Sequence, residues 1–395
     1  MRRQAAGCAL LALLSGCADL SDQEAEALYQ RRFAHYKAGE MTALYDVMEP
    51  VAGAPTAPPL AQAARTSIAG DALSAARAYA QRNSSTAFLV WQGGQLQDQT
   101  YFMGTLRSTL LNALSLAKPL AVLAIGRAMA LGTIASLDQK VGDFISEWRG
   151  TAKGAMTIDN LLHMQSGLQA QDFSMDPASV TNRVYLSPFH DRVLIQDYPL
   201  TDPPGTRFAY SNAAADLVAI IIERASGRRY AQFLSEELLR PLQAMGGTLW
   251  LDRPGGTAHA GCCIQLPAET WLRLGILVLQ DGVWNGRTLV DPAFMRQMTT
   301  PVSDNRDAGM MGIYLGTRFT PRRGFTGPGQ PGPQVLHGEP YLAPDLVLFD
   351  GNADQVLYIV PSAGLVALRM GNPPPKQPEW DNSVIPNLLL RGLAR

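Results

Sequence analysis

A serine and a lysine three residues apart, Ser115 and Lys118, are the first side chains in this sequence that could perform chemistry together. Three residues make nearly one helical turn, so both side chains project from the same face of a helix. Residues 121–131 are apolar on nearly every side, which predicts a buried helix that begins at or just before Ser115. A buried amine is costly to keep charged, so Lys118 can serve as the base that activates the serine hydroxyl. The pattern alone fits equally well a helix cap beside a lysine that reaches solvent.

The composition indicates a globular chain with a large core and no surface for nucleic acid. Its 395 residues are 47% hydrophobic, and the formal net charge is -1 with acids and bases interspersed. Of the four cysteines, Cys8 and Cys17 lie near the N-terminus, and Cys262 and Cys263 are adjacent. Neighbouring cysteines rarely form a strain-free disulfide, so we expect two separate, small, buried side chains. No spacing matches a zinc site, and neither a metal nor an organic cofactor is expected.

The first residues resemble a bacterial lipoprotein signal peptide. Arg2 and Arg3 form a positive start, residues 9–14 form a short apolar run, and the sequence Leu-Ser-Gly before Cys17 completes the pattern. The resemblance implies that residues 1–16 are removed and that Cys17 is lipidated. An apolar run this short cannot span a bilayer. We therefore expect a protein of the bacterial cell envelope that faces the periplasm and is anchored by lipid only, to the outer membrane.

The order of the predicted elements describes an α/β (α+β) protein. Residues 17–59 read as an N-terminal tether, in which a polar helical piece is followed by a linker rich in proline and alanine, and residues 60–395 as the main domain. Strands are predicted over 86–92, 95–103, 346–349, 355–360 and 365–370, and helices over 72–81, 213–225, 230–239, 268–279 and 383–393. Residues 169–209 and 301–345 read as long loops. Strands near both ends with helices between them predict an antiparallel sheet flanked by helices, with an all-helical insertion.

Two further motifs accompany the serine and the lysine: Tyr210-Ser-Asn212, and the turn Phe349-Asp350-Gly351 that leads into a strand. Their neighbourhoods include LLHMQSGL at 161–168, PPGTRFAYSN at 203–212 and GVWNG at 282–286. In order and spacing these segments resemble the serine β-lactamase and penicillin-binding-protein-like hydrolases over about residues 60–395. Within that family, the segments are most similar to the class C branch, which includes class C β-lactamases, family VIII-type esterases and 6-aminohexanoate-dimer hydrolases. The resemblance implies a β-lactamase/transpeptidase-like fold.

The same resemblance implies a role for each motif residue. Ser115 would be the nucleophile that is acylated, and Lys118 its activating base. Tyr210 would pass the proton to the leaving group, alone or together with Lys118, which agrees with the tendency of a nearby cation to favour the phenolate. Asn212 would hydrogen-bond the lysine and the substrate. The chain is thus expected to be a serine hydrolase that cleaves an ester or amide of a small molecule.

The third motif departs from the β-lactamases. In the family, the backbone N-H groups of the serine and of the residue just past this motif stabilise the oxyanion, and here the latter residue is Asn352, after Gly351. Phe349 stands where many relatives carry a lysine or histidine that helps to bind a substrate carboxylate. Phenylalanine supplies no charge, and Asp350 would repel an anionic substrate if it faced the site. We therefore expect a neutral or cationic ester or amide substrate.

Other interpretations remain open at this level. A penicillin-binding D,D-peptidase or a weak β-lactamase would share the same acylation residues, and a non-catalytic envelope binding protein could share the fold. His163 is interpreted as a packing residue of its motif. A triad with His190 and Asp191 is disfavoured because no G-x-S-x-G elbow occurs. The sequence does not determine an oligomeric state.

Overall fold

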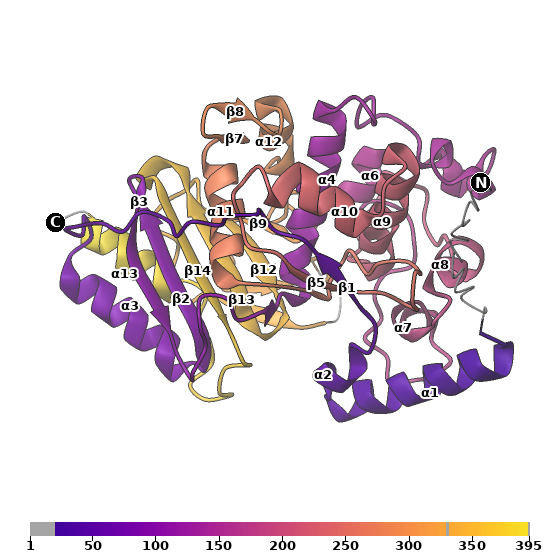
Figure 1. Ribbon diagram of the computed structural model, residues 1–395, viewed down its shortest axis with the longest axis horizontal. Coiled ribbons are helices and arrows are strands. Elements are labelled where there is room, and N and C mark those ends of the chain that lie inside the picture. Colours follow the sequence, from indigo (N-terminus) through magenta and orange to yellow (C-terminus); the bar gives the residue numbers. More distant parts are fainter. Residues whose placement is uncertain (1–19, 329–331, 394–395) are drawn as a thin grey trace, which may run out of the picture.

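A six-stranded antiparallel sheet forms one half of the molecule in the computed structural model, which describes residues 20–328 and 332–393. The strand order is β3-β2-β14-β13-β12-β9, so strands from both ends of the domain lie side by side (Figure 1). Every neighbouring pair is antiparallel. The strands are β2 (Ser85–Gln92), β3 (Gln95–Tyr101), β9 (Ile313–Leu315), β12 (Val347–Gly351), β13 (Gln355–Val360) and β14 (Leu365–Gly371).

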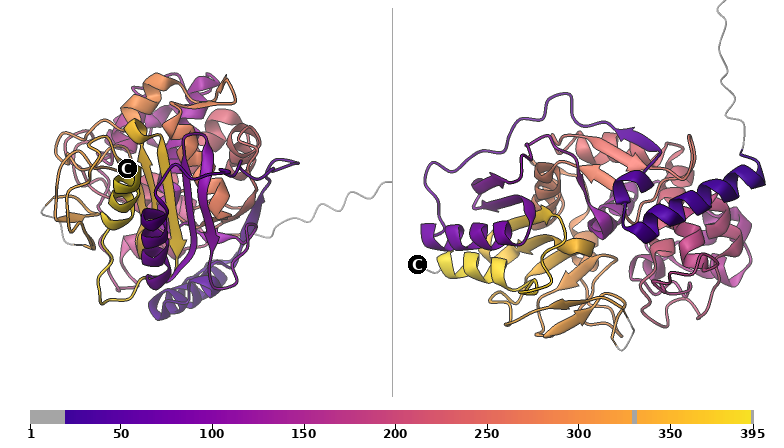
Figure 2. Two further views of the ribbon diagram at one scale, coloured as in Figure 1. Left: turned by 90° about the vertical axis from the view of Figure 1, so that its left-hand side faces the viewer. Right: turned by 90° about the horizontal axis from the view of Figure 1, so that it is seen from below.

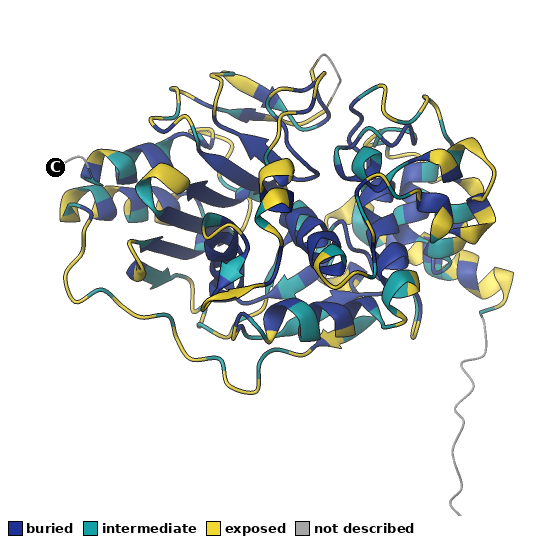
Figure 3. Ribbon diagram, turned by 90° about the horizontal axis from the view of Figure 1, so that it is seen from above, coloured by how far each residue is buried: buried dark blue, intermediate teal, exposed yellow. Residues whose placement is uncertain are grey.

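Helices cover both faces of this sheet. Helix α11 (Ala268–Leu279) packs on β2, β13 and β14, while α3 (Gly70–Arg82) and α13 (Val384–Leu393) pack together on the opposite face (Figures 1 and 2). In α3 the buried side chains are Leu73, Ala76, Tyr79 and Ala80, a spacing that gives the helix one apolar face. The three strands β12, β13 and β14 are buried along almost their whole length because they are covered on both sides (Figure 3).

The helical insertion forms the other half of the molecule. Its central helix α4 (Ala117–Ala130) is buried from Ala117 to Ala128 and packs against α9 (Asn212–Ser226). Both helices begin beside the predicted site, which is why they can position its residues. The other helices of this half are α5 (Ala152–Ala155), α6 (Ile158–Leu162), α7 (Val180–Leu186), α8 (His190–Arg192), α10 (Tyr230–Leu234) and α12 (Pro292–Met298). The predicted fold class, an antiparallel sheet flanked by helices with a helical insertion, is confirmed.

The N-terminal residues expected to form a tether are folded against the rest of the protein. Helix α1 (Asp22–Ala38) and α2 (Met41–Leu44) are followed by β1 (Met48–Val51), which pairs with β5 (Gly247–Trp250). β5, β6 (Ile264–Leu266) and β4 (Leu111–Asn112) complete a second sheet. Arg32, 1% exposed, donates two hydrogen bonds to the Asp46 carboxylate. Figure 2 shows α1 lying along the helical half.

Two segments predicted as loops contain regular structure. Residues 169–209 include α7, α8 and a π-helical turn at Val193–Asp197, and residues 301–345 include β9 and the hairpin β10 (Arg322–Gly324) and β11 (Gln334–Leu336). The elements are short, so their periodicity is too brief to be recognised in a sequence. No described helix is both long and apolar enough to cross a membrane. The predicted signal peptide and Cys17 lie outside the described residues, and their assignment stays a prediction.

Candidate active site

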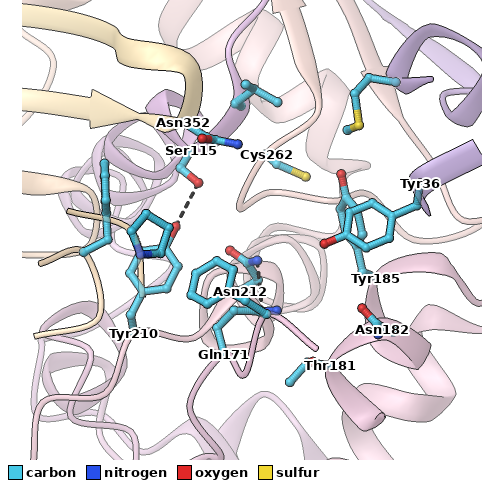
Figure 4. A pocket seen from close by; sticks show the side chains of 15 residues that line it. Tyr36, Ser115, Gln171, Thr181, Asn182, Tyr185, Tyr210, Asn212, Cys262 and Asn352 are labelled. Carbon is cyan, nitrogen blue, oxygen red and sulfur yellow. Dashed lines mark hydrogen bonds between the residues drawn. The ribbon is translucent and has the colours of Figure 1, made fainter. Parts of the chain in front are cut away.

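Ser115 lies in a 3-10 turn, Leu114–Leu116, that joins β4 to α4. The α-helix begins two residues later than the apolar pattern predicted, because the turn before it is wound more tightly. Leu114 has a φ of 49°, and its N-H donates to Asn112 Oδ1 at 3.2 Å. Such a conformation costs a non-glycine residue about 1–3 kcal/mol and concentrates at functional sites. The side chain of Ser115 borders a cavity of about 220 Å³ (Figure 4).

The three residues predicted to carry out acylation meet at the serine hydroxyl. Ser115 Oγ lies 2.8 Å from Tyr210 Oη and 3.1 Å from Lys118 Nζ. The Lys118 ammonium also lies 4.9 Å from the centre of the Tyr210 ring. Lys118 and Tyr210 belong to segments about ninety residues apart, brought together by the packing of α4 on α9. A hydroxyl within hydrogen-bond distance of two proton-transfer groups has the geometry that a nucleophilic serine requires.

The lysine is buried, with 0% exposure, and all its hydrogen-bond donors are used. Besides Ser115 Oγ, Lys118 Nζ donates to Asn212 Oδ1 and to the Gly261 carbonyl oxygen, both at 2.8 Å. An ammonium has three donors and no acceptor, so these three acceptors satisfy it completely. The alternative of a lysine that reaches solvent is therefore excluded. The Asn212 amide group donates in turn to Gln171 Oε1 at 3.1 Å, which keeps its carbonyl oxygen turned toward the lysine.

Gly261 was not assigned a role from the sequence, because the contact uses its backbone carbonyl. The Gly261 N-H donates to Asp216 Oδ1 at 2.7 Å, so a carboxylate on α9 holds the peptide that contacts Lys118. A Cβ on residue 261 would lie 2.8 Å from the Ala215 side chain, which explains the need for glycine. Burial raises the pKa of Asp216. A contact made by a backbone carbonyl cannot be predicted from the residue type. The only signal in the sequence at this position is the glycine itself.

The end of β12 forms the other side of the nucleophile turn. Gly351 lies against the turn: a Cβ built on it would be 2.6 Å from the Leu116 nitrogen. The next residue, Asn352, lines the cavity together with Ser115 (Figure 4). Arg369 donates to the carbonyl oxygens of Ala353 and Asp354, and Gln355 also donates to the Ala353 carbonyl. The turn after Gly351 is therefore fixed by side-chain hydrogen bonds. These contacts hold the turn that carries Asn352 beside the nucleophile turn.

The cavity has an aromatic and apolar wall facing the serine and amide side chains at its base. Tyr36 of α1 and Met41 of α2 contribute to the wall, so the N-terminal residues help to build the site. Figure 4 shows Tyr36 and Tyr185 across the cavity from Ser115. Among the described residues that line the cavity, none carries a charged side chain: Tyr36, Met41, Leu114, Ser115, Gln171, Phe173, Thr181, Asn182, Tyr185, Tyr210, Asn212, Cys262, Phe325, Pro333 and Asn352.

The third motif brings no charge to this cavity. Phe349 is buried and is not among the lining residues. Asp350, the possible source of repulsion, does not face the site either: its carboxylate is buried, pairs with Arg323 and accepts from Asn382 Nδ2 at 3.0 Å. Alternation along the strand places Asp350 on the face opposite Gly351. The selectivity of the site therefore rests on neutral side chains.

The histidines considered from the sequence lie elsewhere. His163 ends α6 and its Nδ1 lies 3.0 Å from an Asp159 oxygen, outside the cavity lining. His190 is buried with its Nδ1 on the Val184 carbonyl, and Asp191 pairs with Arg253. Neither histidine lines the cavity with Ser115, in agreement with the absence of a G-x-S-x-G elbow.

The adjacent cysteines correct an expectation. Cys262 and Cys263 are joined by a disulfide, whereas two separate thiols were predicted. A turn at Cys263, whose φ is 64°, makes this possible, and residue type gives no sign of such a turn. Cys262 lines the cavity, and both cysteines follow the glycine whose carbonyl contacts Lys118. The disulfide is therefore part of the wall of the site.

Fold and site together define a serine hydrolase of the β-lactamase/transpeptidase type. Residues 60–382 match the family model described as Beta-lactamase, which covers well over half of the chain. The chain therefore belongs to the beta-lactamase family of hydrolases. The resemblance noted from the motifs is confirmed at this level.

Individual relatives are hydrolases of the same fold. The chain is 27% identical over 229 residues to a 6-aminohexanoate-dimer hydrolase of Paenarthrobacter ureafaciens, an alignment that covers 54% of this chain and 56% of the relative. The chain thus spans little more than half the length of that relative. A Bacillus anthracis structure described as a 6-aminohexanoate-dimer hydrolase superposes with a TM-score of 0.68 at 19% identity, covering 92% and 93% of the two chains. A family VIII carboxylesterase superposes with a TM-score of 0.57 at 14% identity, covering 82% and 98%. These two likenesses show the fold.

Proposed function

We propose that the protein hydrolyses a neutral ester or amide through an acyl-enzyme on Ser115, with Lys118 and Tyr210 as proton-transfer groups. The observation that carries the proposal is the position of Ser115 Oγ, 3.1 Å from Lys118 Nζ and 2.8 Å from Tyr210 Oη. Both groups lie within hydrogen-bond distance of the hydroxyl, so either can take its proton as the serine oxygen attacks.

In the acylation step, the serine oxygen bonds to the substrate carbonyl carbon as its proton passes to Lys118 or Tyr210. The carbonyl electron pair moves onto oxygen, where the N-H groups of Ser115 and Asn352 face it. Collapse of this intermediate breaks the bond to the alcohol or amine, which leaves with a proton supplied by Tyr210. Water then attacks the ester, gives its proton to the same groups, and the serine oxygen leaves and is protonated again.

The cavity favours an uncharged substrate. None of its described lining residues is charged, so a carboxylate entering it would lose its water shell without gaining an ionic partner. A cation would be favoured only through the faces of the aromatic side chains. The site thus differs from a β-lactamase site at the position of Phe349, and strong β-lactam hydrolysis is not expected. Since one relative is named a 6-aminohexanoate-dimer hydrolase, that dimer belongs in a substrate panel as the charged member to set against neutral esters and amides.

The proposal is tested by turnover of short-chain p-nitrophenyl esters and amides, with intact-mass analysis of the protein after incubation. We expect an acyl adduct on wild-type protein and no turnover by Ser115→Ala, a loss of at least about 1000-fold. Lys118→Ala and Tyr210→Phe should impair the acylation phase severely. Ser303→Ala, which removes an exposed serine, is the control and should behave as wild type.

Two outcomes would redirect the assignment. Labelling by a fluorescent penicillin, lost in Ser115→Ala, together with no ester or amide turnover, would favour a penicillin-binding D,D-peptidase or a weak β-lactamase. A folded protein inert to a fluorophosphonate and to the whole panel would leave a non-catalytic binding protein. Turnover that survives in Ser115→Ala would contradict the mechanism itself.

A further inference from the structure

Three ionisable side chains converge in the core behind the catalytic lysine. Asp216 lies on α9, one turn after Asn212; His190 is the first residue of α8; and His259 lies between β5 and β6. The two histidines are 0% exposed and Asp216 is 1% exposed. One ligand atom from each lies within 4.8 Å of the others. None of the three lines the substrate cavity, so the proposed hydrolysis does not use this cluster directly.

The histidine nitrogens that face Asp216 lack hydrogen-bond partners in the described part of the chain. His190 Nε2 and His259 Nδ1 lie 3.8 Å and 3.7 Å from Asp216 Oδ2, beyond hydrogen-bond distance. His190 Nε2 and both ring nitrogens of His259 are buried without a partner among the described residues. Leaving a buried polar atom unpaired costs about 1–3 kcal/mol. Of these atoms, His190 Nε2 and His259 Nδ1 both face Asp216 Oδ2, and two unpaired nitrogens beside one carboxylate oxygen call for an occupant.

The outward-facing atoms of two of these side chains are held by the backbone. The His190 Nδ1-H donates to the Val184 carbonyl, which leaves Nε2 as the nitrogen with a free electron pair. The second Asp216 oxygen, Oδ1, accepts from the Gly261 N-H at 2.7 Å. The His259 ring stacks on Trp250, with ring centres 4.2 Å apart. Such outer contacts fix the tautomer and the orientation of side chains that bind metals.

We propose that His190, Asp216 and His259 form a binding site for one divalent transition-metal ion of the zinc class, through His190 Nε2, His259 Nδ1 and Asp216 Oδ2. Two ligands of a tetrahedral zinc, each about 2.1 Å from the metal, lie roughly 3.4 Å apart. The two nitrogen-oxygen separations of 3.8 Å and 3.7 Å need to shorten by only a few tenths of an ångström. Two imidazoles and one carboxylate suit zinc or cobalt, and calcium and magnesium prefer an all-oxygen set.

The site would be structural. Its ligands come from three separate segments and are closed off from solvent, so the ion must enter as the chain folds, and its binding energy adds to folding stability. Asp216 also holds Gly261, whose carbonyl accepts from Lys118. The ion would therefore stiffen the support of the catalytic lysine. This proposal departs from the expectation of a metal-free protein. The site could not be recognised from the sequence because its ligands are far apart: His259 lies 69 positions after His190 and 43 positions after Asp216.

The test uses the full chain, produced with zinc sulfate in the medium and purified through a tag that contains no histidine. We expect about one zinc per chain by elemental analysis, and a visible d-d absorption when cobalt replaces zinc during refolding. Asp216→Asn and His259→Gln should each lose most of the metal. His337→Gln is the matched control, since His337 is also buried with an unpartnered Nε2 but lies outside the cluster, and it should keep the metal.

Two results would overturn the proposal. One is wild-type protein with less than about a tenth of a zinc per chain despite zinc in excess, which would assign the gap to a buried water. The other is metal retained at wild-type level by Asp216→Asn and His259→Gln. If these variants do not fold, X-ray absorption on the zinc-loaded wild type decides. A shell of nitrogen and oxygen with two imidazoles supports the site, and a sulfur ligand, which would point to the cysteines, refutes it.

Discussion

Replacing Gly351 by alanine should damage catalysis far more than folding. The backbone of Gly351, with φ of -127° and ψ of 160°, is one that any residue can adopt. The obstacle is the added Cβ, which would lie 2.6 Å from the Leu116 nitrogen and 3.3 Å from the Ser115 carbonyl carbon. Both are backbone atoms of the nucleophile turn, so no side-chain rotation can relieve the contact. The turn and the end of β12 must move apart.

The size of that movement sets the expected effect. Non-bonded heavy atoms settle at roughly 3.5 Å or more, so the strand and the turn must separate by roughly 0.9 Å. The turn carries the Ser115 N-H and the end of β12 carries the Asn352 N-H, so this separation moves apart the two groups proposed to stabilise the oxyanion. Misplacing catalytic groups by about 1 Å costs about 100-fold in rate, or about 2.7 kcal/mol of transition-state stabilisation. Substrate binding uses the other walls, so kcat should fall and KM should change little.

The assay compares kcat and KM of Gly351→Ala and wild type on one p-nitrophenyl ester, with melting curves for both. Gly70→Ala is the control, because a Cβ there meets no atom within 4 Å and the φ is not in the left-handed region. That variant should keep wild-type kinetics. If Gly351→Ala melts like wild type and keeps kcat within about threefold, the end of β12 does not supply an oxyanion donor and the reasoning fails.

Three further predictions concern stability and the wall of the site. Burial raises the pKa of Asp354 to about 7, so between about pH 4 and 7 the folded state keeps a proton that the unfolded chain has lost, and stability falls across that window. Asp354→Asn should therefore raise the free energy of unfolding at pH 8 by on the order of 1 kcal/mol and leave it nearly unchanged at pH 4. Urea titrations at the two pH values measure this, and equal changes at both would contradict it. Arg32→Met should lower the free energy of unfolding by about 3 kcal/mol, because it leaves the partly buried Asp46 carboxylate without its ionic partner. Arg31→Met changes an exposed neighbour and should not lower it; similar losses in both variants would argue against the ion pair. Reduction of the Cys262–Cys263 disulfide, checked by a mass gain of two hydrogens, should lower kcat and hardly shift the melting temperature, since the bond closes no long loop; unchanged kcat after full reduction would remove the disulfide from the working site.

Much of the site could be predicted from residue type and spacing. The Ser115-to-Lys118 interval is local, and helical geometry alone places the two side chains on one face. Tyr210 and Asn212 were found through their motif at the start of a helix with a clear apolar pattern. Helix α11 was predicted over the residues that it occupies, because its apolar run is long and bounded by a proline and a turn. Long periodic segments and local motifs are thus what the sequence by itself determined.

The rest depended on contacts between distant residues. The Gly261 carbonyl contacts Lys118 although the two residues are 143 positions apart, and the residue type gives no sign of a backbone carbonyl contact. The N-terminal helix was expected to be part of a tether because it is polar overall, yet Tyr36 reaches the cavity once Arg32 and its neighbours are buried. His190, Asp216 and His259 meet only because α8, α9 and the segment before β6 pack together. Tertiary packing decided these features, since burial and close approach are properties of the folded chain and not of any local segment.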